Sequence, residues 1–90
     1  MRHAYLIISH NEFMVLEKLV RALDVEWNDI YIHFDKKLKS CPAFETLHAG
    51  LHILKERTDI RWGHISLIKA EYALFEAAYS RGGYSYYHLL

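Results

Sequence analysis

The stretch Tyr5-Leu6-Ile7-Ile8-Ser9-His10-Asn11 decides the fold class. Its first four residues form a continuous apolar run rich in β-forming side chains, and three polar residues close it. A strand without polar alternation is typical of a parallel sheet that is covered on both faces. The sequence therefore predicts a buried parallel strand near the start of the chain, with polar side chains at its carboxyl end.

An amphipathic helix is predicted directly after this strand, over about residues 12–23. Asn11 is placed to cap the helix with its side-chain oxygen, and Glu12 suits the positive end of the helix dipole. Apolar residues recur at spacings of three and four, as one face of a helix requires. These residues are Phe13, Leu16, Val20 and Leu23.

A second strand is predicted over residues 29–34, where apolar side chains alternate, and it ends at the charged Asp35-Lys36-Lys37. Two interpretations of residues 42–54 stay open. The favoured one is a short helix from Pro42 to Ala49, ended by Gly50 and followed by a third strand over 51–54. The other is a single helix over 42–54, which costs about 1 kcal/mol for Gly50 in its interior.

The clearest helical stripe in the chain lies between residues 65 and 79, and Gly82-Gly83 ends this helix. The stripe consists of Ile65, Ile68, Tyr72, Phe75 and Tyr79. Residues 84–90 are aromatic and apolar and are predicted to form a fourth strand, within which the sequence ends. Strands alternating with helices predict a doubly wound α/β fold with a parallel sheet, in which the fourth strand lies beside the first. Its outer edge, apolar and without lysine, predicts self-association as a homodimer.

Composition excludes several classes of protein. The 90 residues carry 11 Lys and Arg against 11 Asp and Glu, and 52% are hydrophobic. This apolar content argues against disorder, and the neutral balance argues against nucleic acid as the main partner. A single cysteine, Cys41, fits a reducing compartment, and no signal-peptide core precedes the first strand, so a cytoplasmic location is expected.

The common sequence motifs for nucleotide binding, catalysis and metal binding indicate no function for this chain. There is no glycine-rich dinucleotide fingerprint and no P-loop. Ser66 and Lys69 match the S-x-x-K pattern, but the companion motifs of that enzyme class are absent. His48 and His52 lack a third ligand at a suitable spacing, so no metal site is predicted. Asp35 is a candidate from its position, because ligands bind at the carboxyl ends of parallel strands, but an aspartate that starts a turn is the ordinary interpretation there.

Four segments, taken in order, resemble the amino-terminal part of the core-2/I-branching glycosyltransferase family. They are residues 4–11, Ile32-His33-Phe34-Asp35-Lys36-Lys37, Ile60-Arg61-Trp62-Gly63-His64-Ile65-Ser66 and residues 84–90. The resemblance implies a GT-A fold, of which this chain holds the Rossmann-like β-α-β half. It also implies transfer of a sugar, GlcNAc- or xylose-like, from a UDP-sugar donor to a hydroxyl of a glycan or protein acceptor with inversion at the anomeric carbon.

The resemblance places the uridine part of the donor against Asp35 and against Ile8, Ser9 and His10, without a metal ion or other cofactor. Trp62-Gly63 is interpreted as structural. The family's catalytic carboxylate and diphosphate-binding residues come later than Leu90, so the 90 residues are expected to form the amino-terminal portion of a longer domain and to be inactive alone. The alternative is a complete small α/β module that binds a ligand or regulates, without catalysis.

Overall fold

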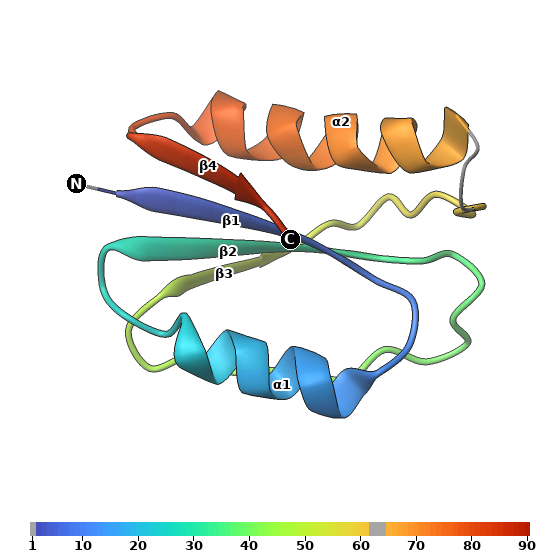
Figure 1. The fold of residues 1–90 in the computed structure, drawn as a ribbon, viewed down its shortest axis with the longest axis horizontal. Coiled ribbons are helices and arrows are strands. Elements are labelled where there is room, and N and C mark those ends of the chain that lie inside the picture. The colour runs from blue at the N-terminus through green and yellow to red at the C-terminus, as the bar shows by residue number, and fades with distance from the viewer. Residues whose placement is uncertain (1, 62–64) are drawn as a thin grey trace.

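A parallel four-stranded sheet with a helix on each face forms the molecule, seen in a computed structural model that describes residues 2–61 and 65–90 (Figure 1). The elements are β1 (His3–Ser9), α1 (Phe13–Ala22), β2 (Asn28–Phe34), β3 (Gly50–Ile53), α2 (Ile65–Arg81) and β4 (Tyr86–Leu89). The strand order is β3-β2-β1-β4, and every neighbouring pair is parallel. The predicted α/β class and the position of the fourth strand beside the first are confirmed.

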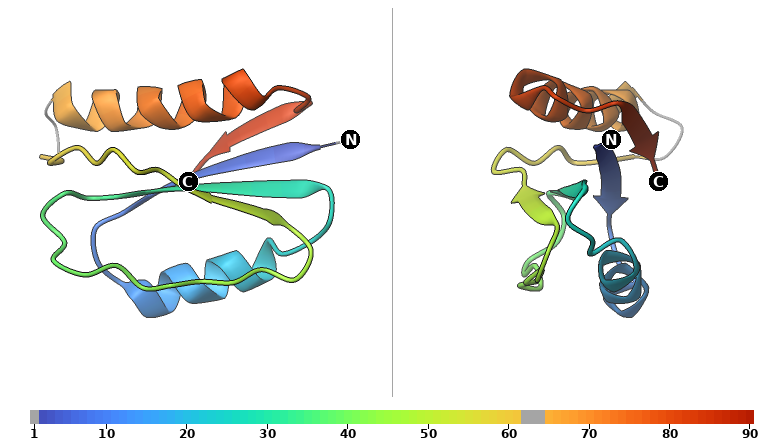
Figure 2. Two further views of the ribbon diagram at one scale, coloured as in Figure 1. Left: turned by 180° about the vertical axis from the view of Figure 1, so that it is seen from behind. Right: turned by 90° about the vertical axis from the view of Figure 1, so that its left-hand side faces the viewer.

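The two central strands supply both halves of the core. Successive residues of a strand point to opposite faces, so Ile7 and Ile32 pack with Leu16 and Val20 of α1. On the other face Leu6 and Tyr31, with Ala4, pack against Leu74 and Ala78 of α2. Figure 2 shows α1 and α2 on opposite sides of the sheet. This two-sided burial explains why the sequence of β1 lacks polar alternation.

The link between β2 and β3 contains no helix, so both helical interpretations of residues 42–54 are wrong, although the predicted third strand exists. The carboxylate of Asp24 accepts hydrogen bonds from the N–H groups of Leu47, His48 and Ala49, each at 2.8 Å. In a helix those N–H groups would bond to carbonyls four residues earlier. These three N–H bonds, led by that from Leu47, hold the pKa of Asp24 below its usual value.

The stripe that identifies α2 in the sequence is not the face that packs on the sheet. The helix buries Ala70, Leu74 and Ala78, whereas Tyr72 and Tyr79 of the stripe are exposed. Small side chains let the helix axis approach the strands closely, and this decides the orientation of α2. In the described part of the chain, no helix is long and apolar enough to cross a membrane.

Gly50 begins β3 and does not end a helix. A Cβ atom built on it would lie 2.6 Å from Oδ1 and 3.0 Å from Cγ of Asp29. Asp29 cannot yield easily, because it accepts hydrogen bonds from Arg2 at 2.7 Å and from the Tyr84 hydroxyl. Gly50 therefore lets β3 pass close to a buried carboxylate.

We predict that Gly50→Ala lowers the free energy of unfolding by about 1–3 kcal/mol, because the added methyl group must displace Asp29. Urea denaturation of the variant and of the parent chain measures the loss. In the background of Asp29→Ala the same methyl group has room, so the penalty should shrink by more than half. An equal penalty in both backgrounds would mean that close approach to Asp29 is not the reason for the glycine.

Candidate functional site

The carboxyl ends of β1 and β2 lie side by side, as predicted. Ser9 is in register with Phe34, and the N–H of Asp35 donates to the carbonyl of Ser9 at 2.9 Å. The polar residues that follow the two strands therefore meet at one end of the sheet, where open parallel sheets bind ligands.

A pocket of about 210 Å³ lies at the end of β1. Three of the four residues predicted for the site line it: Ile8, Ser9 and His10. The rest of its wall comes from Ile7, from Asn11 and Glu12 before α1, from α1 itself and from Leu90, and most of the wall surface is apolar. Leu90 was not among the predicted site residues; its N–H donates to the carbonyl of Leu6 at 2.9 Å, which places it beside β1.

Ser9 gives this pocket a polar group of its own. The residue is 5% exposed, and its Oγ has no hydrogen-bond partner among the described residues. A buried hydroxyl without a partner costs free energy. Because Oγ has almost no accessible surface, a ligand in the pocket would recover that free energy only if the serine side chain rotates toward it.

The amino end of α1, which adjoins Ser9, lacks a side-chain cap. Asn11 does not cap the helix as predicted; Glu12 occupies the cap position, with a left-handed backbone (φ 59°, ψ 47°) and no capping bond from its side chain. Few residues other than glycine adopt this conformation. The positive end of the helix dipole is therefore open beside the pocket.

Asp35 lies next to the pocket but does not line it. Its side chain is 3% exposed, and Oδ1 accepts the N–H groups of Lys37 at 3.0 Å and Ile60 at 3.3 Å. Oδ2 pairs with Nζ of Lys37 at 3.0 Å. Burial by itself raises the pKa of Asp35, but the N–H and ammonium of Lys37 and the N–H of Ile60 outweigh it and hold the pKa low. The carboxylate is thus ionised and already bonded within the chain.

Residues 57–60 bind to the end of β2 through a set of bonds that no sequence signal indicated. The guanidinium of Arg57 donates to the carbonyls of Phe34 at 3.2 Å, Asp35 at 2.7 Å and Leu38 at 2.7 Å. All three acceptors are backbone carbonyls, and because every residue has one, no sequence pattern marks these as partners of Arg57. Arg57 therefore closes the turn after β2 and holds Asp35 in place.

His33 makes a second connection to this segment from inside the sheet. It is fully buried, and its Nε2 accepts the N–H of Thr58 at 3.0 Å. Because a backbone N–H can only donate, Nε2 is unprotonated and the ring carries its proton on Nδ1. Burial lowers the pKa of His33, so the ring is neutral at pH 7.

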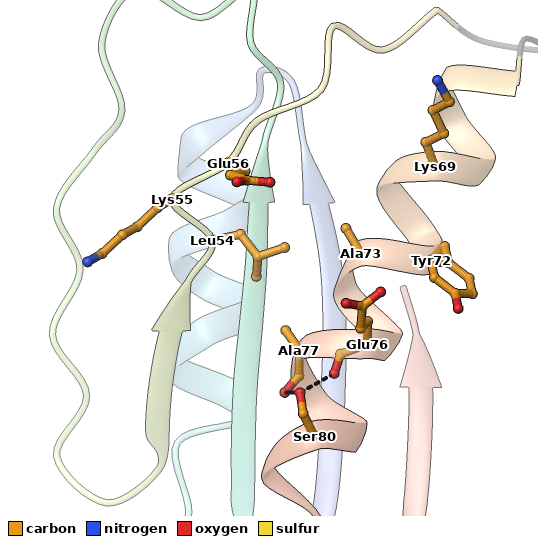
Figure 3. A pocket seen from close by; sticks show the side chains of 9 residues that line it. All are labelled: Leu54, Lys55, Glu56, Lys69, Tyr72, Ala73, Glu76, Ala77 and Ser80. Carbon is orange, nitrogen blue, oxygen red and sulfur yellow. Dashed lines mark hydrogen bonds between the residues drawn. The ribbon is translucent and has the colours of Figure 1, made fainter.

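A second pocket, of about 400 Å³, lies between residues 54–56 and one side of α2 (Figure 3). Its charged side chains are balanced: Lys55 and Lys69 against Glu56 and Glu76. None of the residues predicted for the site lines it. The pocket therefore carries no excess of positive or negative charge that would select a charged ligand.

Other candidates from the sequence are placed as follows. Trp62-Gly63 lies outside the described residues. Oγ of Ser66 accepts the N–H of Arg61 at 2.8 Å at the start of α2, which is the structural role expected of a serine there. Within residues 2–61 and 65–90, no cluster of three or more His, Cys, Asp or Glu side chains could hold a metal ion.

Comparison with known proteins adds no assignment, since no family model, curated protein or solved structure matches the chain. The resemblance to the core-2/I-branching family rests on the quoted motifs alone.

We predict that Asp35→Asn lowers the free energy of unfolding by about 1–3 kcal/mol, because a buried charge-assisted network loses its anion. Asp59→Asn is the matched control: Asp59 also pairs with Lys37, at 2.8 Å, but its side chain is 49% exposed. Its loss should cost less than about 1 kcal/mol. Thermal and urea denaturation compare the two, and equal losses would refute the buried role of Asp35.

The depressed pKa of His33 predicts a loss of stability on acidification. The unfolded chain binds a proton near pH 6.5, whereas the folded chain resists it, so stability falls as pH drops from about 6.5 toward the folded pKa. The carboxylates with lowered pKa, such as Asp35, lose their contribution only at lower pH, below their usual value of 3.8.

His33→Gln keeps an acceptor for Thr58 without titrating, so the decline of stability between pH 7 and 5 should become shallower. His52, whose pKa burial also lowers, keeps part of the decline. His48→Gln, at an exposed position, serves as the control and should leave the slope unchanged. Urea midpoints across this pH range measure the effect, and an unaltered slope in His33→Gln would contradict the assignment.

Proposed function

We propose that this chain is the UDP-sugar-binding, amino-terminal part of an inverting glycosyltransferase of the core-2/I-branching type. The uridine part of the donor would occupy the pocket at the end of β1. Support comes from the quoted motifs, from the parallel sheet, and from the pocket that gathers Ile8, Ser9 and His10.

The buried hydroxyl of Ser9 carries this proposal. A pocket with mainly apolar walls suits the faces of a flat heterocycle, and the unpartnered Ser9 hydroxyl, once rotated toward the pocket, would bond to its edge. The hydroxyl can donate to a ring carbonyl or accept from a ring N–H, and uracil offers both. Glycosyltransferase chemistry itself is an inference from the motifs.

The size of the pocket limits what it takes. At about 210 Å³ it is smaller than the 300–1,000 Å³ typical of sites that enclose a whole drug-sized ligand. It therefore fits the base and part of the ribose, and the diphosphate and sugar would extend beyond it. The open amino end of α1 adjoins the pocket and favours a negative group there.

We assign Asp35 a positioning role in this site. To contact uridine directly, its Oδ2 would have to give up the ammonium of Lys37 at 3.0 Å, and Oδ1 is occupied by two N–H groups. Through its own N–H, bonded to the carbonyl of Ser9, Asp35 fixes the end of β1 where the pocket begins.

In the proposed reaction the acceptor hydroxyl oxygen, on a glycan or protein, attacks the anomeric carbon. The bond from that carbon to the diphosphate oxygen breaks, UDP leaves with the electron pair, and a carboxylate acting as general base takes the hydroxyl proton. We assign neither this base nor the groups that neutralise UDP to the described residues. Their share is to bind and orient the nucleoside.

We predict weak, saturable UDP binding to the 90-residue chain, with NMR shift changes centred on residues 8–16. Ser9→Ala should weaken binding about 2- to 10-fold, the worth of one hydrogen bond. Ser85→Ala, an exposed serine of another loop, is the control and should change nothing. Added Mg²⁺ or Mn²⁺ should leave the affinity unaltered. Absence of shifts around Ser9 at millimolar UDP would refute the site, and metal-dependent binding would refute the metal-free donor site.

A small ligand-binding module without catalysis is the second candidate, and the occupied carboxylate of Asp35 favours it. With that group bonded internally, the pocket recognises its ligand mainly through apolar contact and one hydroxyl. Such a module would bind free uracil as well as it binds UDP. A higher affinity for UDP than for uracil supports the glycosyltransferase proposal, and equal affinities support the module.

A further inference from the structure

The outer face of α2 is an exposed apolar surface. Five large side chains, the α2 stripe, are each between 41% and 77% exposed: Ile65, Ile68, Tyr72, Phe75 and Tyr79. Figures 1 and 2 show α2 as the outermost layer on its side of the sheet. The helix packs on the sheet through Ala70, Leu74 and Ala78, and within the stripe Phe75 also contacts the sheet, with its ring 5.9 Å from that of Tyr87 in β4.

The spacing of the α2 stripe is that of a helix-pairing seam. Its members follow one another at intervals of three, four, three and four residues. This is the a and d pattern of a coiled coil, sustained over about two heptads. The exposed area is on the order of 600 Å², since aromatic side chains present roughly 150–250 Å² each. That approaches the roughly 800 Å² that each partner buries in a standard interface.

The charges beside the stripe distinguish the two ways of pairing. In the stripe the a positions are Ile65, Tyr72 and Tyr79, and the d positions are Ile68 and Phe75. Lys69 and Glu76 each come directly after a d position and lie on one flank of the stripe. Glu71 comes directly before an a position and lies on the other flank. Lys69 and Glu76 are exposed and project from α2 in Figure 3. Neither forms an ion pair with another described residue.

Parallel and antiparallel pairing of two such helices differ in sign. In a parallel pair the flank that carries Glu71 meets the flank of the second helix that carries Lys69 and Glu76. This brings Glu71 to Glu76 of the second helix, which is a repulsive contact. In an antiparallel pair flanks of the same kind meet. Lys69 then faces Glu76 of the second helix, and two-fold symmetry gives this attractive contact twice.

We propose that the α2 stripe binds the same stripe of a second copy of this chain, antiparallel, about a two-fold axis. In the register that pairs Lys69 with Glu76, Ile68 packs against Tyr79 of the second copy and Tyr72 against Phe75. All four positions thereby obtain an apolar partner. This proposal is independent of the proposed function, because none of these residues lines the pocket at β1.

Association through the outer edge of β4 is the competing arrangement, the one expected from the sequence. The strand Tyr86–Leu89 has only four residues, and it lies at the edge of the sheet. Its few unpaired backbone groups provide a smaller contact surface for a second copy than the α2 stripe does. Variants of α2 and of β4 separate the two arrangements.

Sedimentation equilibrium of the 90-residue chain and its variants, over micromolar to millimolar concentrations, tests the proposal. Glu76→Lys places Lys69 opposite a second lysine at each of the two symmetric contacts. Because two weak attractive ion pairs become repulsive, the dimer dissociation constant should rise roughly tenfold. Glu71→Lys is the matched control: it makes the same chemical change on the opposite flank and should leave the constant unchanged. Lys69→Glu combined with Glu76→Lys should restore it.

Ile68→Asp should abolish the dimer, and because Ile68 is 63% exposed the fold should survive, as circular dichroism can verify. Tighter dimers in both Glu71→Lys and Glu76→Lys would indicate parallel pairing and overturn the proposal. So would a dimer lost in Leu89→Lys, on the β4 edge, but kept in Ile68→Asp. A parent chain that stays monomeric at millimolar concentration would overturn it as well.

Discussion

Burial of β1 and β2 on both of their faces is the constraint on which the rest of the structure depends. Each strand supplies alternate side chains to two cores, so two helices are needed to cover them, one on each side. Ile30 and Leu6 are fully buried on opposite faces. A strand that must satisfy two cores has no solvent face, and therefore cannot shift register by one residue without disturbing both. The ends of these strands are accordingly held in a fixed register with each other.

The carboxyl end of β2 is rigid, and the carboxyl end of β1 leaves a polar group unpaired. Asp35, Arg57 and Nε2 of His33 bond to neighbouring backbone, which fixes the turn and the segment after β3, although Nδ1 of His33 has no partner among the described residues. Ser9, one strand away, is equally buried but has no described partner. A preorganised surround with an unsatisfied group beside the pocket is what a small binding site requires, because the surround does not have to be ordered when the ligand arrives.

Much of the fold could be predicted, because the deciding signals are local. The apolar run before Ser9 and the helical spacing within α2 each depend on neighbours in sequence. The connection before Gly50 could not be predicted, since Asp24 bonds to N–H groups more than twenty residues away and removes the helix that Pro42 suggests. The position of Asp35 at the end of β2 was also right, but its contact with the 57–60 segment joins residues more than twenty positions apart, which no local pattern brings together.

The orientation of α2 shows a limit of hydrophobic pattern as a guide to burial. The largest apolar side chains of this helix point outward, and the alanine-bearing face lies on the sheet, because close packing rewards complementary shape as well as hydrophobic area. A periodic stripe thus marks a helix reliably but does not say which surface it covers. In this chain the stripe and the β1 pocket belong to opposite sides of the sheet, since α2 covers one face and α1, which walls the pocket, covers the other. Neither surface shares a residue with the other, so pairing through α2 leaves the pocket accessible. The two properties can therefore be separated by mutation, because a change at Ile68 alters one and a change at Ser9 alters the other.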